Sequence, residues 1–322
     1  MKWLKQSILI YMQIKKKDKI FIAGHKGMVG SAIHNVLREK GFQNILIKTR
    51  KELDLLNQSK TFKFLKKKKP KIIFIAAAKV GGIAANINSK HKFLYENLQI
   101  QNNLIHGAYL AGVKNLILLG SSCIYPKHCK QPMKESFLLS GPLEETNDAY
   151  ALAKITGIKM CEYYSKKYNL NYKSLMPPNL YGPNDNYDLN NSHFYPALIK
   201  KIHLAKKNNK KILTLWGTGK AKRELMFVVD FAKAAIYFMN KKFKEPFLNI
   251  GNGTEFTINW YAKFIMKQLD LKLKIEYDIS KPDGMPKKCL DISLAKKYGW
   301  KPSNNFKKGF DITYKKFLEL NN

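Results

Sequence analysis

The sequence predicts an α/β fold, in which a Rossmann-type, doubly wound parallel sheet is followed by a smaller C-terminal α/β substrate lobe. Three observations support this prediction. Short apolar strands alternate with helical segments between residues 19 and 176, as parallel βαβ units require. A glycine-rich segment, Gly24-x-x-Gly27-x-x-Gly30, separates the first strand from the first helix. After residue 177 the alternation becomes irregular, which indicates a separate lobe.

The first half of the chain contains short apolar strands separated by helices with recognisable ends. Three of these helices stop at Gly41, Pro70 and Gly112, residue types that terminate helices. Because helices cover both faces of a parallel sheet, its strands should be apolar throughout, and these runs nearly are. The expected strands are 19–23, 45–48, 72–78, 116–119 and 172–176, and the expected helices are 31–40, 60–69, 93–111 and 148–168.

The second half is expected to form the lobe and to return strands and helices to the first domain. A loop is predicted at 180–192, which is rich in Asn, Gly, Pro and Asp. Helices are predicted at 196–207, 227–239, 258–269 and 306–318, with a strand at 212–215 and a turn at 217–219. We therefore divide the chain into an extension (1–18), a nucleotide-binding domain (19–178) and a mainly substrate-binding lobe (179–322).

The N-terminal extension mixes a short apolar stretch with lysines. The stretch is short for a signal peptide and lacks a small-residue cleavage site. We expect a dispensable extension with Met12 as an alternative start, and a surface helix that touches a membrane is the other interpretation. No apolar run approaches the roughly 18 residues of a membrane span.

The formal net charge of +35 suggests nucleic-acid binding, but the composition argues against it. Of the 58 basic residues, 55 are lysine and only Arg38, Arg50 and Arg223 are arginine. Nucleic-acid readers use the planar fork of arginine, and these lysines are spread along the whole chain. We interpret the charge as compositional drift and expect no nucleic-acid partner. The competing hypothesis is a decayed reductase fold whose basic surface binds nucleic acid or anionic lipid.

The four cysteines, Cys123, Cys129, Cys161 and Cys289, show no zinc-binding spacing. A chain of this length without a signal peptide is also an unlikely setting for a disulfide framework. The sequence therefore predicts no metal site and a location in the reducing cytoplasm.

The glycine-rich segment predicts a dinucleotide site, since the backbone of such a turn and the following helix N-terminus accommodate a pyrophosphate. NAD sites usually place an acidic residue at the end of the second strand. Here that strand ends Lys48-Thr49-Arg50, and a cation suits a 2′-phosphate. Lys26 in the glycine loop offers a second charge. The sequence therefore predicts NADP(H) rather than NAD(H).

The segment Tyr150-x-x-x-Lys154 predicts a proton donor. Residues four apart share one face of a helix, and an ammonium beside a phenol lowers the phenol pKa. The hydroxyl of Ser121, brought alongside, could hold a substrate oxygen. The preceding strand, serines and glycine loop make this reading stronger than that of a solvated helix face.

Five segments carry a resemblance to a known family. They are Phe21-Ile22-Ala23-Gly24-His25-Lys26-Gly27-Met28-Val29-Gly30, Ala76-Ala77-Ala78-Lys79-Val80-Gly81-Gly82-Ile83, Gly120-Ser121-Ser122-Cys123-Ile124-Tyr125-Pro126, Asn179-Leu180-Tyr181-Gly182-Pro183 and Lys281-Pro282-Asp283-Gly284. From about residue 19 to the C-terminus the chain resembles the GDP-L-fucose synthases of the extended short-chain dehydrogenase/reductase family. The resemblance implies 3,5-epimerisation of GDP-4-keto-6-deoxy-D-mannose, followed by NADPH-dependent reduction of its C4 ketone.

The resemblance also implies catalytic roles. Ser121 and Tyr150 would hold the C4 oxygen, Lys154 would tune Tyr150, and Cys123 and His193 would exchange protons at C3 and C5. From the residues alone, a buried core cysteine and a helix-capping histidine are the competing interpretations. A related 4-epimerase or 4,6-dehydratase is the alternative function, although a dehydratase needs an acidic pair where Cys123 stands.

The binding residues that the resemblance implies form two sets. The cofactor set is Gly24, His25, Lys26, Gly27, Met28, Val29, Gly30, Arg50, Asp54, Leu55, Ala77, Leu119, Gly120, Ser121, Ser122, Lys154, Pro177, Pro178, Asn179, Leu180 and His193. The substrate set is Asn179, Lys201, Trp216, Arg223, Asp283 and Lys288. Pro178 replaces a family threonine and Lys201 a family arginine. The resemblance further implies a homodimer, in which helices 93–111 and 150–168 of two subunits form a four-helix bundle.

Overall fold

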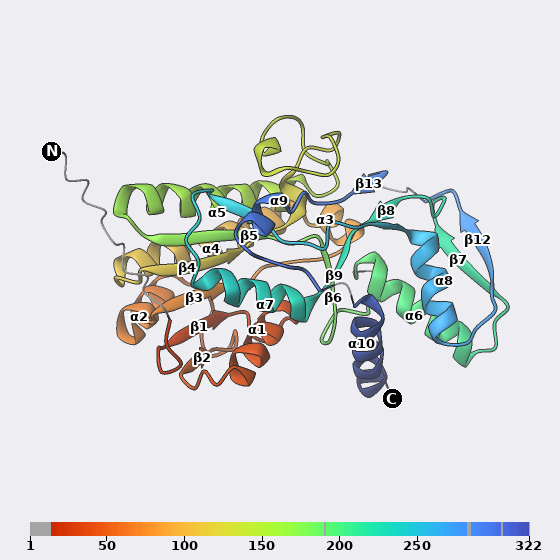
Figure 1. Cartoon of the computed structure of the whole chain (residues 1–322), viewed down its shortest axis with the longest axis horizontal. Coiled ribbons are helices and arrows are strands. Elements are labelled where there is room, and N and C mark those ends of the chain that lie inside the picture. Colours follow the sequence, from red (N-terminus) through yellow and green to blue (C-terminus); the bar gives the residue numbers. More distant parts are fainter. Residues whose placement is uncertain (1–13, 190, 282–284, 304, 322) are drawn as a thin grey trace.

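The computed structural model describes residues 14–189, 191–281, 285–303 and 305–321, and its two regions are distinct in Figure 1. The larger region is built on a six-stranded sheet with the order β10-β5-β4-β3-β1-β2. All of its neighbouring strands pair in parallel. The strands are β1 (Ile20–Ala23), β2 (Ile45–Ile47), β3 (Ile72–Ile75), β4 (Asn115–Leu119), β5 (Asn171–Met176) and β10 (Phe247–Asn249). The predicted doubly wound parallel sheet is therefore confirmed.

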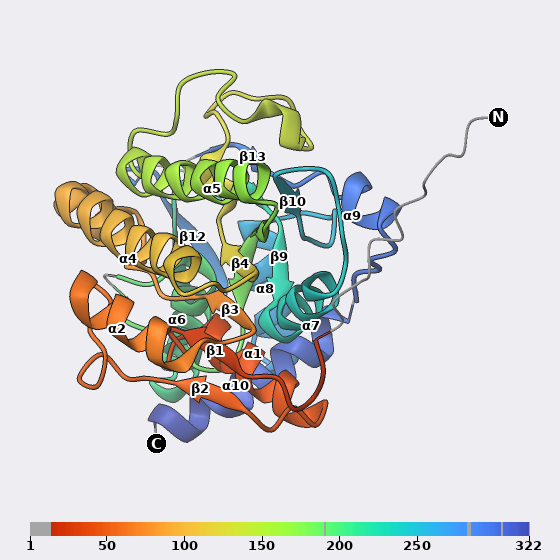
Figure 2. The ribbon, with the colours of Figure 1, turned by 90° about the vertical axis from the view of Figure 1, so that its left-hand side faces the viewer.

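Helices cover both faces of this sheet, and each face has its own apolar core (Figure 2). One face carries α1 (Met28–Glu39) and α7 (Val228–Met239), with α9 (Ser293–Lys297) packed beside them. The other face carries α2 (Gln58–Lys68), α4 (Lys90–Leu110) and α5 (Asp148–Tyr168). The strands between them are buried along their length in β1, β3 and β4, as the apolar runs predict. Shorter helices α3 (Ile83–Asn88), η1 (Ser122–Ile124) and η2 (Glu135–Phe137) follow strands or loops.

The smaller region has a third apolar core, between α6 (Phe194–Lys207), α8 (Ile258–Gln268) and α10 (Phe306–Asn321). Beside these helices, β7 (Ile212–Trp216) pairs in parallel with β12 (Lys274–Asp278). A three-stranded sheet joins β8 (Lys222–Arg223), β11 (Phe256–Thr257) and β13 (Lys287–Lys288). A parallel pair, β6 (Asn179–Tyr181) and β9 (Leu225–Phe227), lies between the two regions in Figure 1. The second half therefore supplies both the lobe and, through β10 and α7, part of the first region.

Several predicted boundaries are wrong by a few residues. Helix α1 begins at Met28 instead of residue 31, and α6 begins at Phe194, which places Pro196 in the first turn where its missing N–H costs nothing. Strand β6 lies within the loop expected from residue 180, because it pairs with β9, which is distant in sequence. Such tertiary pairing leaves no local periodicity to detect.

The described part of the extension is attached to the first region. Ile14 is only 4% exposed, and its N–H donates to Asn240 Oδ1 at 2.9 Å. Met12 and the apolar stretch before it lie outside the described residues. None of the helices that the structure describes is long and apolar enough to span a membrane.

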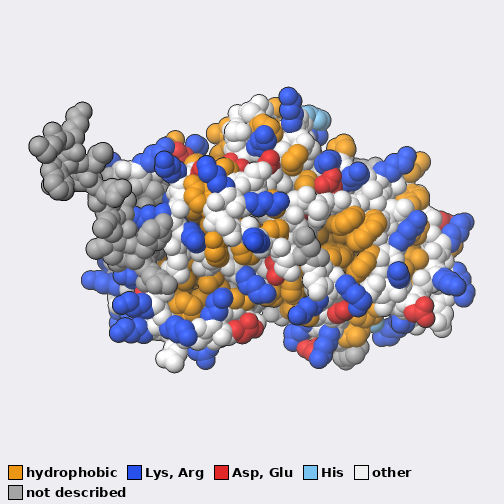
Figure 3. All heavy atoms as spheres, in the orientation of Figure 1, with side chains coloured by type: hydrophobic (Ala, Val, Ile, Leu, Met, Phe, Trp, Pro, Cys, Tyr) orange, Lys and Arg blue, Asp and Glu red, His pale blue; other side chains and the backbone are white. Residues whose placement is uncertain are grey.

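The basic residues do not gather into one patch on the face in Figure 3, where lysines and arginines are scattered among apolar and polar side chains. Many lysines are paired, as in the bond between Lys166 Nζ and Glu162 Oε1 at 2.6 Å. On this face the distribution is the one expected from compositional drift and not that of a nucleic-acid-binding stripe.

Candidate active site

The glycine loop after β1 has the geometry of a dinucleotide turn. Gly24 has φ of +87°, and a Cβ there would lie 2.6 Å from the Ala77 backbone nitrogen. A Cβ on Gly30 would overlap the Gly24 carbonyl oxygen, whereas one on Gly27 would meet no described atom closer than 3.6 Å. Gly24 and Gly30 are therefore required by close packing within the protein, and Gly27 keeps open the space next to the loop.

The same loop leaves polar groups available for a ligand. Helix α1 begins after Gly27 with no side-chain cap, so amide N–H groups of its first turn point out of the helix end. The Nδ1 atom of His25 is buried and has no hydrogen-bond partner among the described residues. Both features fit the pyrophosphate of a dinucleotide. Met28 and Val29 pack against the core, and Lys26 is exposed.

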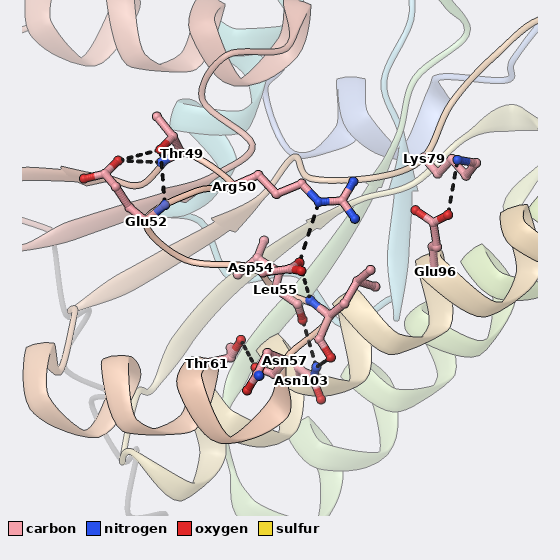
Figure 4. A network of polar contacts seen from close by, with 11 residues as sticks. Thr49, Arg50, Glu52, Asp54, Leu55, Asn57, Thr61, Lys79, Glu96 and Asn103 are labelled. Atoms are coloured by element: carbon pink, nitrogen blue, oxygen red, sulfur yellow. Dashed lines mark hydrogen bonds and ion pairs between the residues drawn. The ribbon is translucent and has the colours of Figure 1, made fainter.

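The loop after β2 carries the side chains expected to select between NADP and NAD (Figure 4). Arg50 exposes 73% of its side chain, and its Nε lies 3.8 Å from Asp54 Oδ1. Glu52 accepts hydrogen bonds from Lys48 Nζ and from the Thr49 N–H and hydroxyl, each at 2.8 Å. The Lys48 bond, followed by those from Thr49, lowers the pKa of Glu52 to about 2. Glu52 is therefore engaged within its own loop, and Arg50 is an exposed cation beside it.

The carboxyl end of β4 brings Ser121 and Tyr150 together with Lys154. Ser121 Oγ accepts the Cys123 N–H at 3.2 Å, which starts the short helix η1. Lys154 is only 4% exposed, and its Nζ donates to the Leu119 carbonyl at 2.9 Å while lying 5.6 Å from the Tyr150 ring centroid. The expected grouping of hydroxyl, phenol and ammonium is therefore present in the structure.

The expected effect of Lys154 on Tyr150 is wrong for this structure. Burial, followed by the charge of Cys123, raises the pKa of Tyr150, and hydrogen bonding with Ser121 opposes the rise. The Lys154 ammonium donates its hydrogen bond to the Leu119 carbonyl and not to the Tyr150 hydroxyl. Burial also lowers the pKa of Lys154 to about 8. Tyr150 is therefore a neutral phenol at pH 7, which is the form that donates a proton.

Cys123 is half-buried and has two polar neighbours on its sulfur. Lys288 Nζ donates to Cys123 Sγ at 3.3 Å, and Asn147 Nδ2 donates at 3.6 Å. The two cysteines that are fully buried are Cys161 and Cys289. The competing interpretation of Cys123 as an inert core residue is therefore not supported. Neither contact was predicted, because Lys288 is far from Cys123 in sequence and Asn147 belongs to no motif.

His193 lies immediately before α6, and its loop is packed against the segment that follows β3. The Gly82 N–H donates to the Asn191 carbonyl at 2.9 Å, and a Cβ on Gly82 would lie 2.6 Å from the Ser192 oxygen. His193 occupies the N-cap position of α6, as the capping interpretation expects, but its side chain makes no capping hydrogen bond to the helix and so remains available for another role. His193 is exposed to solvent as a residue, and the desolvation that neighbouring atoms still impose on its ring, followed by the charge of Lys288, lowers the pKa of its imidazole.

The lobe presents an aromatic surface with cations. Trp216 is 56% exposed, and Lys201 Nζ and Lys281 Nζ lie 5.0 and 5.9 Å from its ring centroid. Trp216 is therefore an exposed aromatic residue and does not belong to the apolar core of the lobe. Arg223 donates to the Met285 carbonyl at 2.6 Å. Asp283, the remaining predicted substrate residue of this lobe, lies outside the described residues.

Glu224 is a buried residue that the sequence analysis did not assign. Its carboxylate accepts the N–H groups of Asn252, Gly253 and Leu290 at 2.6–2.8 Å, and its carbonyl accepts Asn179 Nδ2 at 3.5 Å. Burial raises the pKa of Glu224 to about 7, and these hydrogen bonds oppose the rise. Glu224, which follows β8, therefore joins the loop at 252–253, the segment at Leu290 and strand β6. Its position between Arg223 and an apolar residue was the only sequence signal.

The remaining predicted cofactor residues line the carboxyl edge of the sheet through their backbones. The Pro177 carbonyl accepts the Ser122 N–H at 3.1 Å, and the Gly120 N–H donates to the Leu175 carbonyl at 2.9 Å. The Leu55 carbonyl accepts Asn103 Nδ2 at 2.8 Å. The other side chains of this set pack within the apolar cores or at their edge; these are Ala77, Leu119 and Leu180.

Comparison with known proteins places this geometry in a family. A "Putative GDP-L-fucose synthase 2" from Arabidopsis thaliana is 46% identical, over 95% of this chain and 93% of that relative. The GDP-L-fucose synthase of Escherichia coli (strain K12) is 44% identical, over 94% and 97%. A solved GDP-mannoheptose C4 reductase from Campylobacter jejuni with NADP bound is 36% identical, with a TM-score of 0.88, over 95% and 100%. The model of the NAD dependent epimerase/dehydratase family matches residues 20–251, and the chain belongs to that family.

Proposed function

We propose that the protein is a GDP-L-fucose synthase, which converts GDP-4-keto-6-deoxy-D-mannose to GDP-L-fucose by 3,5-epimerisation and C4 reduction. One observation carries the proposal: the thiol of Cys123 lies two residues from Ser121, and both residues are neighbours of Tyr150. A simple ketone reductase needs the hydroxyl pair but has no use for the thiol. The identity of 44–46% to proteins named GDP-L-fucose synthase supports the same conclusion.

Epimerisation requires that a C–H bond next to the ketone be broken and re-formed on the opposite face. Ser121 and Tyr150 donate hydrogen bonds to the C4 oxygen and stabilise the enolate that forms when the proton leaves. Cys123 and His193 act on the ring from two chain segments, one of them taking a proton and the other returning one. A neutral imidazole and a thiol exchange protons at neutral pH at little cost.

Reduction uses the same oxygen contacts a second time. The alkoxide that forms at C4 takes the Tyr150 phenol proton, which is available because burial keeps this phenol protonated. Bound NADPH supplies the hydride for C4. Lys154 lies beside Tyr150 and would bind the nicotinamide ribose. Its ammonium would then exchange its present hydrogen bond to the Leu119 carbonyl for one to the ribose.

The cofactor is NADP(H), and the fit rests on the two loops after β1 and β2. The open space at Gly27 and the uncapped start of α1 would hold the pyrophosphate. Arg50 would bind the 2′-phosphate through its exposed guanidinium, since the neighbouring Glu52 is engaged with Lys48 and Thr49.

The GDP part of the substrate would occupy the lobe. Trp216 offers an exposed face on which guanine could stack, and Lys201 lies beside that face. Arg223 and Lys201 would neutralise the diphosphate, and Asn179 would orient the sugar. These residues all follow residue 178, where we place the boundary between the nucleotide-binding domain and the lobe.

The protein would work as a cytoplasmic homodimer. Helices α4 and α5 pack side by side on one face of the sheet (Figure 2). Large apolar side chains are exposed on them, including Tyr95, Leu152 and Tyr163. A second copy of the same pair would cover these side chains in a four-helix bundle.

The proposal is tested by incubating the protein with GDP-4-keto-6-deoxy-mannose and NADPH in deuterium oxide, with the product identified by NMR. GDP-L-fucose that carries deuterium at C3 and C5 is the expected result. Reduction without deuterium at either carbon would show a C4 reductase instead. Tightly bound NAD and no net consumption of NADPH would indicate a 4-epimerase.

A further inference from the structure

Lys288 is held at the edge of the site by a short strand pair. It is the register partner of Arg223 in the parallel pairing of β13 with β8. Its carbonyl accepts the Glu224 N–H at 3.1 Å, and two residues later the Leu290 N–H donates to Glu224 Oε2 at 2.8 Å. Because Glu224 is fully buried, the backbone that carries Lys288 is fixed on both sides of the residue.

The two neighbouring lysines of β13 have different partners. Lys287 Nζ pairs with Glu255 Oε1 at 2.6 Å, as is common for a lysine near the surface. Lys288 Nζ instead donates to Cys123 Sγ at 3.3 Å. Successive strand residues point to opposite faces, so this difference follows from the pleat of β13. A lysine ammonium is a donor without acceptor capacity, and it binds a thiolate more strongly than a thiol.

The charge of Lys288 acts on further groups around the site. It contributes, after desolvation, to the lowered pKa of His193, and it opposes the rise in pKa that burial causes at Cys129. The other titratable group that faces Cys123 is Tyr150 on α5, whose pKa the charge of Cys123 raises. One ammonium therefore acts on both members of the pair to which we assign proton exchange.

We propose that Lys288 is a positioning residue for epimerisation, which holds the Cys123 sulfur in place and stabilises its thiolate form. The proposal rests on the function proposed above and adds a role to it. In each epimerisation one of the pair takes a proton from carbon and the other returns one to the opposite face, after which solvent exchange restores both. Whether Cys123 gives or takes the proton first, its cycle passes through a thiolate, and Lys288 lies against that thiolate.

The experiment compares Lys288→Met, Lys288→Arg and the matched control Lys287→Met in the full-length protein. The first readout needs no substrate: it is the rate at which iodoacetamide alkylates Cys123 between pH 6 and 9, followed by peptide mass spectrometry so that Cys129 is counted separately. The second readout is solvent deuterium uptake at C3 and C5 of GDP-4-keto-6-deoxy-mannose, measured against the rate of NADPH oxidation.

Lys288→Met is expected to lower Cys123 alkylation at pH 7 about tenfold, because the variant removes the charged donor that lies 3.3 Å from the sulfur. Deuterium uptake should fall by about 10- to 100-fold and NADPH oxidation by less. Lys288→Arg should recover part of both losses, and Lys287→Met should match the wild type.

Three outcomes separate the hypotheses. Unchanged Cys123 alkylation in a Lys288→Met protein with wild-type circular dichroism would overturn the role of Lys288. This conclusion would hold whether or not deuterium uptake and NADPH oxidation change. If Lys288→Met unfolds, the neutral variant Lys288→Gln is compared with the wild type, and equal alkylation with reduced deuterium uptake would mean a role in substrate binding only. Wild-type protein that takes up no deuterium would overturn the proposed function, while the alkylation result would still stand for Lys288.

Discussion

We call the residues to which we assign reduction the reductase side of the site and those to which we assign proton exchange the epimerase side, and the two are built in different ways. Ser121 follows β4, a strand of the central sheet, and Tyr150 and Lys154 belong to α5, which packs on one face of that sheet. Cys123, His193 and Lys288 come from η1, the start of α6 and β13, which are far apart in the sequence. The first group is assembled by one βα unit, whereas the second exists only when the lobe and the first region are both folded.

The two sides also differ in how they are buried. Lys154 is enclosed in the first region and bonded to the Leu119 carbonyl. His193 is held by a loop that packs on Gly82, and Lys288 is held by the two-residue strand β13. Local unfolding of the lobe should therefore affect proton exchange before it affects the reductase hydroxyls. The predictions below test this separation, beginning with the largest expected effect.

Tyr150→Phe should nearly abolish reduction while it weakens epimerisation less. The variant removes the proton donor for the C4 alkoxide, so NADPH oxidation should fall by about 1,000-fold or more. Ser121 remains to stabilise the enolate, so deuterium uptake should fall by only about 10- to 100-fold. Single-turnover NADPH oxidation and NMR measure the two rates. Equal losses in both rates would mean that the two sides share Tyr150 to the same extent.

Cys123→Ser should produce the opposite pattern. A serine hydroxyl exchanges protons poorly at neutral pH, so deuterium uptake at C3 and C5 should fall by about 100- to 1,000-fold, and ketone reduction by much less. The matched control is Cys129→Ser, which replaces a partly buried thiol six residues away and should leave both rates unchanged. Normal deuterium uptake in Cys123→Ser would remove Cys123 from the mechanism.

The sequence predicted one side of this comparison better than the other, for a physical reason. The glycine turn, the alternating strands and Tyr150-x-x-x-Lys154 are local patterns, and each dictates its structure within a few residues. The contact between Lys288 and Cys123 depends on the pairing of β13 with β8, which no local pattern encodes.

The cysteine and the histidine were assigned through the resemblance, because taken alone their residue types favour a core or a capping role. The pKa of Tyr150 was predicted in the wrong direction, since the spacing showed that Lys154 was near but gave neither the burial of the phenol nor the bond from Lys154 to Leu119. Glu224 was missed because a buried carboxylate that binds backbone N–H groups resembles a surface residue in sequence.

Arg50→Ala should weaken NADPH binding, and therefore reduction, without affecting proton exchange at C3 and C5. Loss of a charge-assisted pair to the 2′-phosphate is worth roughly 1.5–3 kcal/mol, so kcat/KM for NADPH should fall by about 10- to 100-fold. The value for NADH should change little, because NADH lacks this phosphate. Arg38→Ala, on the exposed side of α1, is the matched control. A similar loss with NADH and NADPH would contradict the assignment of Arg50.

Lys154→Met should stabilise the fold while it inactivates reduction. Burial lowers the pKa of Lys154 from its ordinary value of 10.5 to about 8, so below pH 8 the folded protein retains a buried charge that the unfolded chain holds without penalty. Each pKa unit corresponds to about 1.4 kcal/mol, and the lost bond to the Leu119 carbonyl offsets part of the gain. The variant should therefore raise the free energy of unfolding by about 1–2 kcal/mol at pH 7.

The pH dependence of that gain gives the sharpest test. As the pH rises from 8 to 10.5, the folded wild type loses its proton before the unfolded chain does, so the wild type gains stability and the advantage of Lys154→Met disappears. Urea unfolding at pH 7 and pH 10 measures both values. A variant that is less stable than the wild type at pH 7 would mean that the bond from Lys154 to Leu119 outweighs the cost of burying the charge. The reductase side would then be stabilised by its catalytic lysine, and the contrast with the loop-held epimerase side would be larger than proposed.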